Sequence, residues 1–384
     1  MAQSARDVVP MKQIAVVIPL YNHAAFIGDA IRSVLAQTLA VDKIIIVDDG
    51  STDDSVQIVR ALAEPRIELH TQPNSGTHVA LNRGIEKAVG CDYVAILNSD
   101  DVFARERISK CAAFLDETPS IDVVATRLKL IDSTGSEIAF SDPPAKWFAA
   151  AWSVRGSQLD LIEQLGVANF ISSTSNLTGR RAYFLDHPFR HYRYAHDYFF
   201  VLDCALHNRL AVLDDELFSY RVHSTNTISV KPEKLVRELL EMNVDLLISL
   251  APELAVSPNL RCGVAAYHRA AWGNVSSFRA DVFVPLIAYA LGECSRDQLQ
   301  AHLDAVMKFP EASEFPNKAL IKLDPGEAQL GTRLAEKYSR LQGELTRAKA
   351  ELLALRKVWR ESPWLRLGRK LGIKSAREIA TPSS

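Results

Sequence analysis

Short apolar runs alternate with amphipathic stretches along the first hundred residues. Residues 14–18, 44–47 and 93–97 are mostly β-branched or otherwise apolar, and residues 67–70 form a weaker run. These runs predict four strands. Residues 26–35 instead repeat apolar positions every three to four residues, which predicts a helix. Strands that alternate with helices form βαβ units, so the sequence predicts an α/β fold with a mostly parallel sheet flanked by helices.

Polar residues gather where two of these strands end. Further helices are expected over residues 56–62 and 79–89. The second strand runs into Asp48 and Asp49, and the fourth strand runs into the polar segment 98–101. Ligands collect at the carboxyl ends of parallel strands. These strand ends are therefore the first place to expect a binding site.

The second half of the chain changes character in steps. The pattern is weak over residues 133–173, whereas residues 231–310 are expected to form a helical annex. Residues 311–331 contain several prolines and are expected to form a linker. Residues 332–384 begin with apolar residues at alternating steps of four and three, which predicts a coiled-coil-like heptad helix. A basic amphipathic segment that contains Trp359 and Trp364 follows it.

Composition and charge narrow the classes of protein. The chain has 384 residues, with 44 Lys and Arg against 46 Asp and Glu, so its net charge gives no reason to expect nucleic acid as a partner. The five cysteines form no Cys-x-x-Cys pair, which argues against a disulfide scaffold and indicates a reducing compartment. No stretch looks like a secretory signal or a membrane span, so we expect a cytoplasmic protein.

Four segments carry candidate chemistry. They are Ile18-Pro19-Leu20-Tyr21-Asn22, Asp48-Asp49-Gly50-Ser51, Asn74-Ser75-Gly76 with Asn82-Arg83-Gly84, and Asn98-Ser99-Asp100-Asp101. In this order and spacing they resemble the donor-binding half of the family 2 glycosyltransferases, which are inverting, nucleotide-sugar-dependent enzymes with the GT-A fold. The resemblance implies a GT-A catalytic domain over residues 1–230. Within it, residues 12–130 would bind the nucleotide sugar and residues 131–230 would form the acceptor side.

The resemblance also implies how the donor is bound. Asp49, with Asp48 beside it, would accept a hydrogen bond from uracil or another base, and Pro19 and Tyr21 would line the base pocket. Asn74 lies in the loop expected to pass close to the nucleotide. The alternative for the two aspartates is a turn that leads into a helix cap, which their composition also suits.

Asn98-Ser99-Asp100 stands where the family carries its Asp-x-Asp metal motif, so the first acid is replaced by an amide. The resemblance then implies that Mg²⁺ or Mn²⁺ is held by Asp100, and that His223 of Arg221-Val222-His223 is a second ligand. Arg221 would meet phosphate, and Asn98 would bond a ribose or a metal-bound water. Asp101 is expected behind the metal ligand or as the cap of a helix that begins near residue 104. The remaining histidines show no metal-ligand spacing.

The segment Tyr194-Ala195-His196-Asp197 resembles the family's acidic motif, with His196 in place of the usual Glu. By this resemblance Asp197 is the general base that takes the proton of the acceptor hydroxyl. The alternative is that Asp197 is only the N-cap of the apolar helix that follows it.

The sequence therefore predicts a metal-assisted glycosyltransferase that moves a sugar from a nucleotide diphosphate donor, UDP-linked by family preference, to a hydroxyl of a glycan or lipid-linked acceptor. The alternative is a non-catalytic sugar-nucleotide-binding or assembly protein on the same fold. A dehydrogenase is disfavoured because Gly-x-Gly-x-x-Gly does not follow the first strand. The heptad helix predicts a homo-oligomer, and the basic tail suits either the inner face of a membrane or a protein surface.

Overall fold

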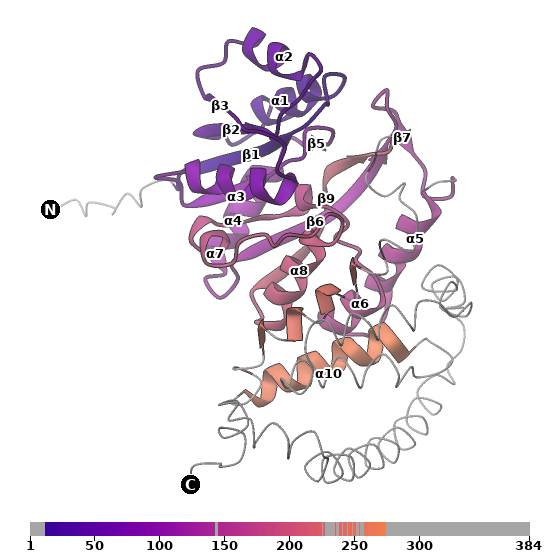
Figure 1. Ribbon diagram of the computed structural model, residues 1–384. Coiled ribbons are helices and arrows are strands. Elements are labelled where there is room, and N and C mark those ends of the chain that lie inside the picture. Colours follow the sequence, from indigo (N-terminus) through magenta and orange to yellow (C-terminus); the bar gives the residue numbers. More distant parts are fainter. Residues whose placement is uncertain are drawn as a thin grey trace, which may run out of the picture. The chain divides into compact units, whose positions relative to one another are not determined.

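A computed structural model describes residues 12–142, 145–224 and 226, single helical positions between 235 and 253, and residues 257–273 (Figure 1). The chain divides after Ile321 into two units. The predicted linker 311–331, the heptad helix and basic tail 332–384, and annex residues 274–310 lie outside the described residues.

The N-terminal half forms the parallel part of one sheet. Its strands are β1 (Ile14–Leu20), β2 (Lys43–Asp48), β3 (Ile67–Thr71) and β4 (Tyr93–Ile96), in the order β3-β2-β1-β4. All three pairings among them are parallel. The four predicted strands are thus confirmed, and the strand ends that carry polar residues lie along one edge of the sheet.

Helices connect these strands and cover both faces of the sheet (Figure 1). They are α1 (Ile27–Leu35), α2 (Ser55–Ala61) and α3 (Thr77–Lys87), close to the predicted positions. Alternate residues of β1 enter different cores, with Val17 in the one beneath α3 and Val16 in the one beneath α1. A Cβ on Gly84 of α3 would lie 2.4 Å from Val17 Cγ1, so only glycine lets this helix pack so closely on β1.

Beyond β4 the sheet is mixed. Its further strands are β5 (Val102–Phe103), β6 (Val123–Ile131), β7 (Glu137–Ile138), β8 (Thr178–Arg180) and β9 (Leu210–Arg221). β8 runs antiparallel to both β4 and β6, whereas β9 runs parallel to β6. The long strand β9 therefore returns its last residues to the edge where β4 ends, which adds Arg221 and His223 to the candidate site.

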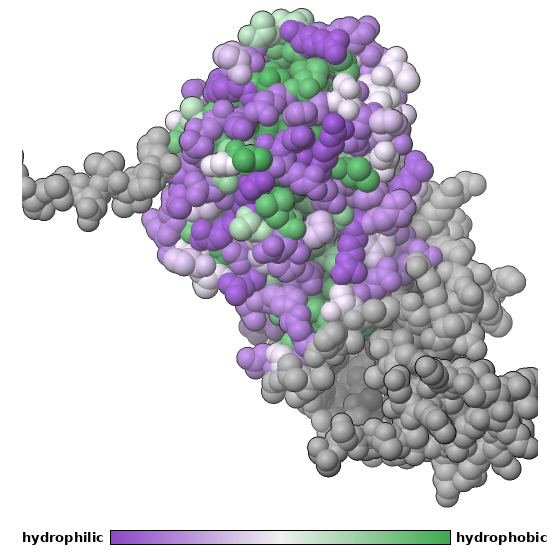
Figure 2. Space-filling view, turned by 60° about the vertical axis from the view of Figure 1, so that its left-hand side comes forward, coloured by the Kyte–Doolittle hydropathy of each residue, from purple (hydrophilic) through white to green (hydrophobic). Residues whose placement is uncertain are grey.

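Further helices with described bounds are α4 (Arg107–Glu117), α5 (Lys146–Ser153), α6 (Leu161–Val167), α7 (Arg181–Asp186), α8 (His196–Leu206) and α10 (Pro258–Gly273), with 3₁₀ turns at Val154–Gly156 and Thr174–Asn176. α4 begins after Glu106, so the prediction that Asp101 caps it is wrong. The face in Figure 2 is mostly hydrophilic over the described residues, with small separate hydrophobic groups. Within the described part of the chain, no helix has the length and apolar character needed to cross a bilayer.

Candidate functional site

Three neighbouring strands place the predicted site residues at one edge of the sheet. β1 lies between β2 and β4, and neighbouring strands are about 4.8 Å apart, so the ends of β2 and β4 are separated by roughly 10 Å. Asp48 and Asp49 stand at the end of β2, and Asn98 and Asp100 follow β4. The turn after β1, which begins at Tyr21, emerges between them.

The turn after β1 is held by the segment that follows β2. Asn22 has a left-handed backbone, with φ 51°, and its Oδ1 accepts a 2.8 Å hydrogen bond from Thr52 N. Asn22 N donates in turn to Ser51 Oγ at 2.9 Å. Ala24 N donates to Asp53 Oδ2 at 2.9 Å, so polar residues of the 48–53 segment fix the position of His23.

Asp49 anchors the loop that leads into α3. Its Oδ1 accepts 2.8 Å hydrogen bonds from Gln72 Nε2 and Ser75 N, and its Oδ2 accepts one from Gly76 N at 2.8 Å. Gly76 has φ +97°, a conformation that favours glycine. The loop therefore depends on the Asp49 carboxylate, which is buried.

Asp48 has more spare acceptor capacity than Asp49. Among the described residues its carboxylate accepts only from Ser51 N, at 3.2 and 3.3 Å to its two oxygens. Tyr21 is 46 % exposed at the same edge, Asn74 is exposed in the loop before α3, and Pro19 lies in β1 beyond the last residue paired with β4. Asp48 and Asp49 are both 4 % exposed, so they differ in hydrogen bonding and not in burial, and the role of the pair in binding a base stays a prediction.

Asp100 meets two imidazoles. His223 Nε2 lies 3.0 Å from Asp100 Oδ2, and the two side chains are only 6 % and 13 % exposed. His23, Asp100 and His223 each offer a ligand atom, and these atoms lie within 4.8 Å of one another. Burial acts to raise the pKa of Asp100, but the hydrogen bond from His223 and the two nearby imidazoles outweigh it and hold the pKa below its ordinary value. A carboxylate with two imidazoles is a donor set that suits a divalent metal ion.

Asn98 bonds the polar residues that precede β8. Its Nδ2 donates to Ser173 Oγ at 3.0 Å and its Oδ1 accepts from Thr174 Oγ1 at 2.8 Å. The predicted bond from Asn98 to a ribose or a metal-bound water is therefore not supported. Asp101 lies behind the site, as predicted, and accepts a 2.6 Å hydrogen bond from Ser175 Oγ.

Arg221 is bonded to several protein oxygens around Asp100. Its Nε donates to Asp100 O at 2.7 Å, and its other donors bond the carbonyls of Asp132 and Ser133 and the carboxylate of Asp29. The side chain is 1 % exposed. These contacts favour a positioning role for Arg221 over the predicted phosphate contact, because protein oxygens already take most of its N–H groups.

Asp197 lies in the first turn of α8 and is buried. The N-cap of α8 is Ala195, so the alternative prediction that Asp197 is the cap is wrong. Burial raises the pKa of Asp197 to about 6, although hydrogen bonds from Tyr198 N and Asn169 lower it in part. Burial and then the charges of Asp101, Asp100 and Asp197 raise the pKa of Tyr220, so these three carboxylates act on one phenol.

A carboxylate from the predicted annex holds the start of α8. Glu238 accepts hydrogen bonds from the backbone amides of Arg193, Tyr194 and Ala195, at 3.0, 2.5 and 2.7 Å. These amides immediately precede the helix that carries Asp197. The described part of the annex therefore positions the candidate base.

The sequence predicts no role for His23, for Ser173 and Ser175, or for Glu238. His23 has a signal in the sequence, because it lies in the turn after the first strand, whose end is in the predicted site. The serines belong to a short polar run whose burial follows only from the tertiary fold. Glu238 is far along the chain, and nothing in its local sequence marks it.

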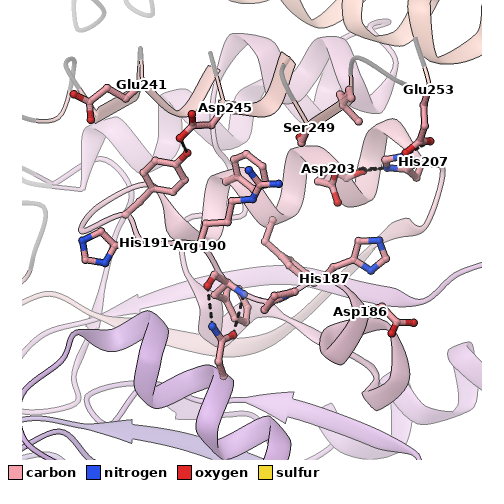
Figure 3. A pocket seen from close by; sticks show the side chains of 17 residues that line it. Asp186, His187, Arg190, His191, Asp203, His207, Glu241, Asp245, Ser249 and Glu253 are labelled. Carbon is pink, nitrogen blue, oxygen red and sulfur yellow. Dashed lines mark hydrogen bonds and ion pairs between the residues drawn. The ribbon is translucent and has the colours of Figure 1, made fainter. Parts of the chain in front are cut away.

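A separate cavity of about 800 Å³ lies between α8, the segment after α7 and helical positions 241–253 (Figure 3). Its lining includes Arg190, Asp203 and Glu253, and Tyr192 Oη donates to Asp245 Oδ2 at 2.6 Å beside it. The predicted site residues do not line it. This cavity is therefore distinct from the cluster at the sheet edge.

Residues 15–185 match the sequence model of glycosyl transferase family 2. An uncharacterized glycosyltransferase of Nostoc sp. is 31 % identical over 226 residues, which cover 56 % of this chain and 66 % of that protein. The uncharacterized glycosyltransferase YibD of Escherichia coli is 45 % identical over 91 residues, or 23 % of this chain and 26 % of that protein.

A crystal structure of S. aureus TarS 1-349 aligns with 73 % of this chain and 79 % of its own, at 19 % identity and a TM-score of 0.49. The matched part of the chain spans between 19 % and 66 % of the length of the first five curated relatives. Those five relatives are all named as glycosyltransferases, and the family match covers β1 to β4 and the polar strand ends. The chain therefore belongs to the family 2 glycosyltransferases.

Proposed function

We propose that this protein transfers a sugar from a nucleotide diphosphate sugar, UDP-linked by family preference, to a hydroxyl of a glycan or lipid-linked acceptor, with inversion at the anomeric carbon. The observation that carries the proposal is the shared edge of the sheet. The Asp48 carboxylate and the His23–Asp100–His223 cluster, which suits a divalent ion, lie there. The buried carboxyl of Asp197, whose pKa is raised to about 6, is near enough to act on the same phenol, Tyr220, as Asp100 does.

The donor would lie across the ends of β2, β1 and β4. Asp48 accepts from the base, and Tyr21 offers an exposed ring beside it. The loop anchored by Asp49 brings the backbone near Asn74 toward the nucleotide. Asp100 and His223 hold Mg²⁺ or Mn²⁺, which when bound supplies positive charge against the charge that develops on the leaving diphosphate.

Asp197 would act on the acceptor. Its carboxylate takes the proton of the acceptor hydroxyl while the hydroxyl oxygen bonds to the anomeric carbon, and the bond from that carbon to the diphosphate breaks with its electron pair. Attack from the face opposite the leaving group inverts the configuration. A pKa raised to about 6 makes Asp197 a stronger base than an ordinary carboxylate and still leaves it mostly ionised at neutral pH.

The experiment is a donor screen with purified protein, a divalent ion and a panel of acceptors, read as release of nucleotide diphosphate. The anomeric configuration of any product is then assigned by NMR. Asp197→Asn should lower release by about 10²–10⁴-fold, whereas Asp203→Asn, at a half-buried carboxyl on the same helix, should retain it. Donor binding without turnover by any acceptor would instead support the non-catalytic alternative.

A further inference from the structure

The cluster at Asp100 contains one more imidazole than the sequence predicts. His23 comes from the turn after β1, Asp100 from the end of β4 and His223 from the residues after β9. The rings of His23 and His223 meet edge to face with centroids 5.8 Å apart, and the Phe26 ring packs against both. Three separate segments thus bring these ligand atoms within 4.8 Å of one another.

The orientation of His23 suits a metal ligand. Its Nδ1 lies 2.7 Å from the Oγ of Ser99, the residue between Asn98 and Asp100 in the sequence. With Nδ1–H as the donor to this hydroxyl, Nε2 keeps its lone pair for an ion. Histidine ligands are usually fixed in this way through the second ring nitrogen. The His23 backbone is fixed as well, because its N donates to Ser55 Oγ at 3.0 Å.

The candidate metal site lacks the first acid of the motif that it resembles. Asn98 replaces the first acid of the motif, is neutral, and commits its amide to Ser173 and Thr174. Asp100 is then the one carboxylate of the His23–Asp100–His223 cluster. Mg²⁺ at a phosphate-binding site is usually held by one or two carboxylates together with waters and phosphate oxygens. An imidazole near such a site adds a donor of the kind that transition-metal ions prefer.

We propose that His23 is the third protein ligand of the cation, together with Asp100 and His223, and that the site prefers a transition-metal ion such as Mn²⁺ over Mg²⁺. The inference rests on the proposed function for the metal role of Asp100 and His223. Imidazole donors suit first-row transition metals, whereas Mg²⁺ prefers oxygen ligands and retained waters. One carboxylate and two neutral imidazoles leave a net positive charge on a bound divalent ion, which favours an anionic diphosphate as the next ligand.

The test is direct ion binding by the full chain in the absence of donor. The protein is freed of metal with a chelator and titrated with Mn²⁺, and free Mn²⁺ is measured by electron paramagnetic resonance. His23→Ala should weaken Mn²⁺ binding by about 10–100-fold. It should reduce the preference for Mn²⁺ over Mg²⁺, measured by competition, because an imidazole ligand is lost. His187→Ala, at a histidine that stacks on Tyr183 outside the cluster, is the matched control and should bind as the wild type does.

Thermal unfolding without metal shows whether each variant is folded, and His23→Gln replaces His23→Ala if the latter is not. Equal Mn²⁺ affinity in a folded His23 variant and the wild type would overturn the inference, even if sugar transfer is demonstrated. An equal affinity of the wild type for Mg²⁺ and Mn²⁺ would overturn the metal preference. Weakened Mn²⁺ binding in a protein that transfers no sugar would support the ligand role and contradict the proposed function instead.

Discussion

Asp197 owes its proposed chemistry to its surroundings. An ordinary aspartate has a pKa near 3.9 and is a weak base at neutral pH. Burial in the first turn of α8 raises the pKa of Asp197 to about 6, while the neighbouring His196 is buried and has its own pKa lowered to about 4. At neutral pH the pair therefore consists of a carboxylate and an uncharged imidazole.

The pH dependence of catalysis should report this carboxyl. Because Asp197 must be ionised to accept a proton, kcat should decrease as the pH is lowered through an apparent pKa of about 6. Asp197→Asn should lower kcat by about 10²–10⁴-fold and remove this acidic limb from any residual activity. The measurement is kcat against pH for both proteins with saturating donor, while Asp203→Asn should keep the wild-type profile. An acidic limb that persists unchanged in Asp197→Asn would assign it to another group.

The same carboxyl should destabilise the folded protein as the pH rises. The pKa of Asp197 is higher in the folded than in the unfolded protein, so the folded state binds this proton more tightly. Protonation therefore stabilises the folded state fully below about pH 4, and this contribution is lost as the pH rises through about 6. Asparagine does not titrate and can still accept from Tyr198 N. The free energy of unfolding of Asp197→Asn, relative to that of the wild type, should therefore increase by roughly 1–2 kcal/mol between about pH 5 and pH 8. Urea unfolding at the two pH values measures this difference, and a gap that does not change with pH would contradict the raised pKa.

Single residues of the site were predictable where a local motif marks them. Asp100 and His223 do meet, as the resemblance to the family implies, although the metal they would hold stays a prediction. The engagement of Asn98 by Ser173 and Thr174 was not predictable, because it depends on a turn more than seventy residues away in sequence. Sequence patterns predict which residue types reach an edge, whereas hydrogen-bond partners from distant segments decide which of them remain available.

At the scale of elements, burial explains which strands the pattern revealed. β1 is buried along its whole length, so it appears in the sequence as an apolar run. β9 alternates between buried and exposed stretches, and β8 is only three residues long. Neither strand gives a clear hydrophobic pattern in the sequence. The antiparallel direction of β8 and the parallel direction of β9 are set by the strands they pair with in the fold. The parallel half of the sheet was therefore predictable, and the mixed half was not.

The contact between the annex and α8 gives a prediction at this scale. Glu238→Ala leaves three backbone amides before α8 without their acceptor, which should lower the free energy of unfolding by about 1–3 kcal/mol. It should also lower kcat more than it changes KM for the donor, because Asp197 is displaced while the residues at β2 and β4 are not. Glu238→Gln keeps one acceptor oxygen, so its free energy of unfolding and its kcat should lie between those of Glu238→Ala and the wild type.

Denaturant unfolding and initial rates on the same preparations measure both effects. Glu253→Ala, at an exposed carboxylate of the same annex that lies 3.1 Å from His207 Nε2 and not against the start of α8, is the control and should leave kcat closer to that of the wild type. A Glu238→Ala protein with wild-type kcat would show that the start of α8 holds its position without this carboxylate.

At the scale of the whole molecule, one continuous sheet joins both halves of the predicted catalytic domain. β4 connects to β6 through β8, and β9 brings Arg221 back beside Asp100, so residues proposed for the donor and for the acceptor share one framework. The family match ends at residue 185, before Asp197 and His223. The part of the site that lies beyond the match therefore depends on the return of β9 and on the support of α8 by Glu238.

Deletion of residues 322–384 tests whether donor binding is confined to the first unit. The described site residues and both hydrophobic cores lie between residues 12 and 273, so the shortened chain should keep the rise in melting temperature that a UDP-sugar and Mn²⁺ produce. The basic tail suits either a membrane or a protein surface, and on the first alternative binding to anionic lipid vesicles should be lost on the same deletion. Thermal shift and vesicle co-sedimentation measure the two properties separately. A shortened protein that no longer responds to the donor would show that residues 322–384 contribute to the site, because a ligand raises the melting temperature only of a fold that can bind it.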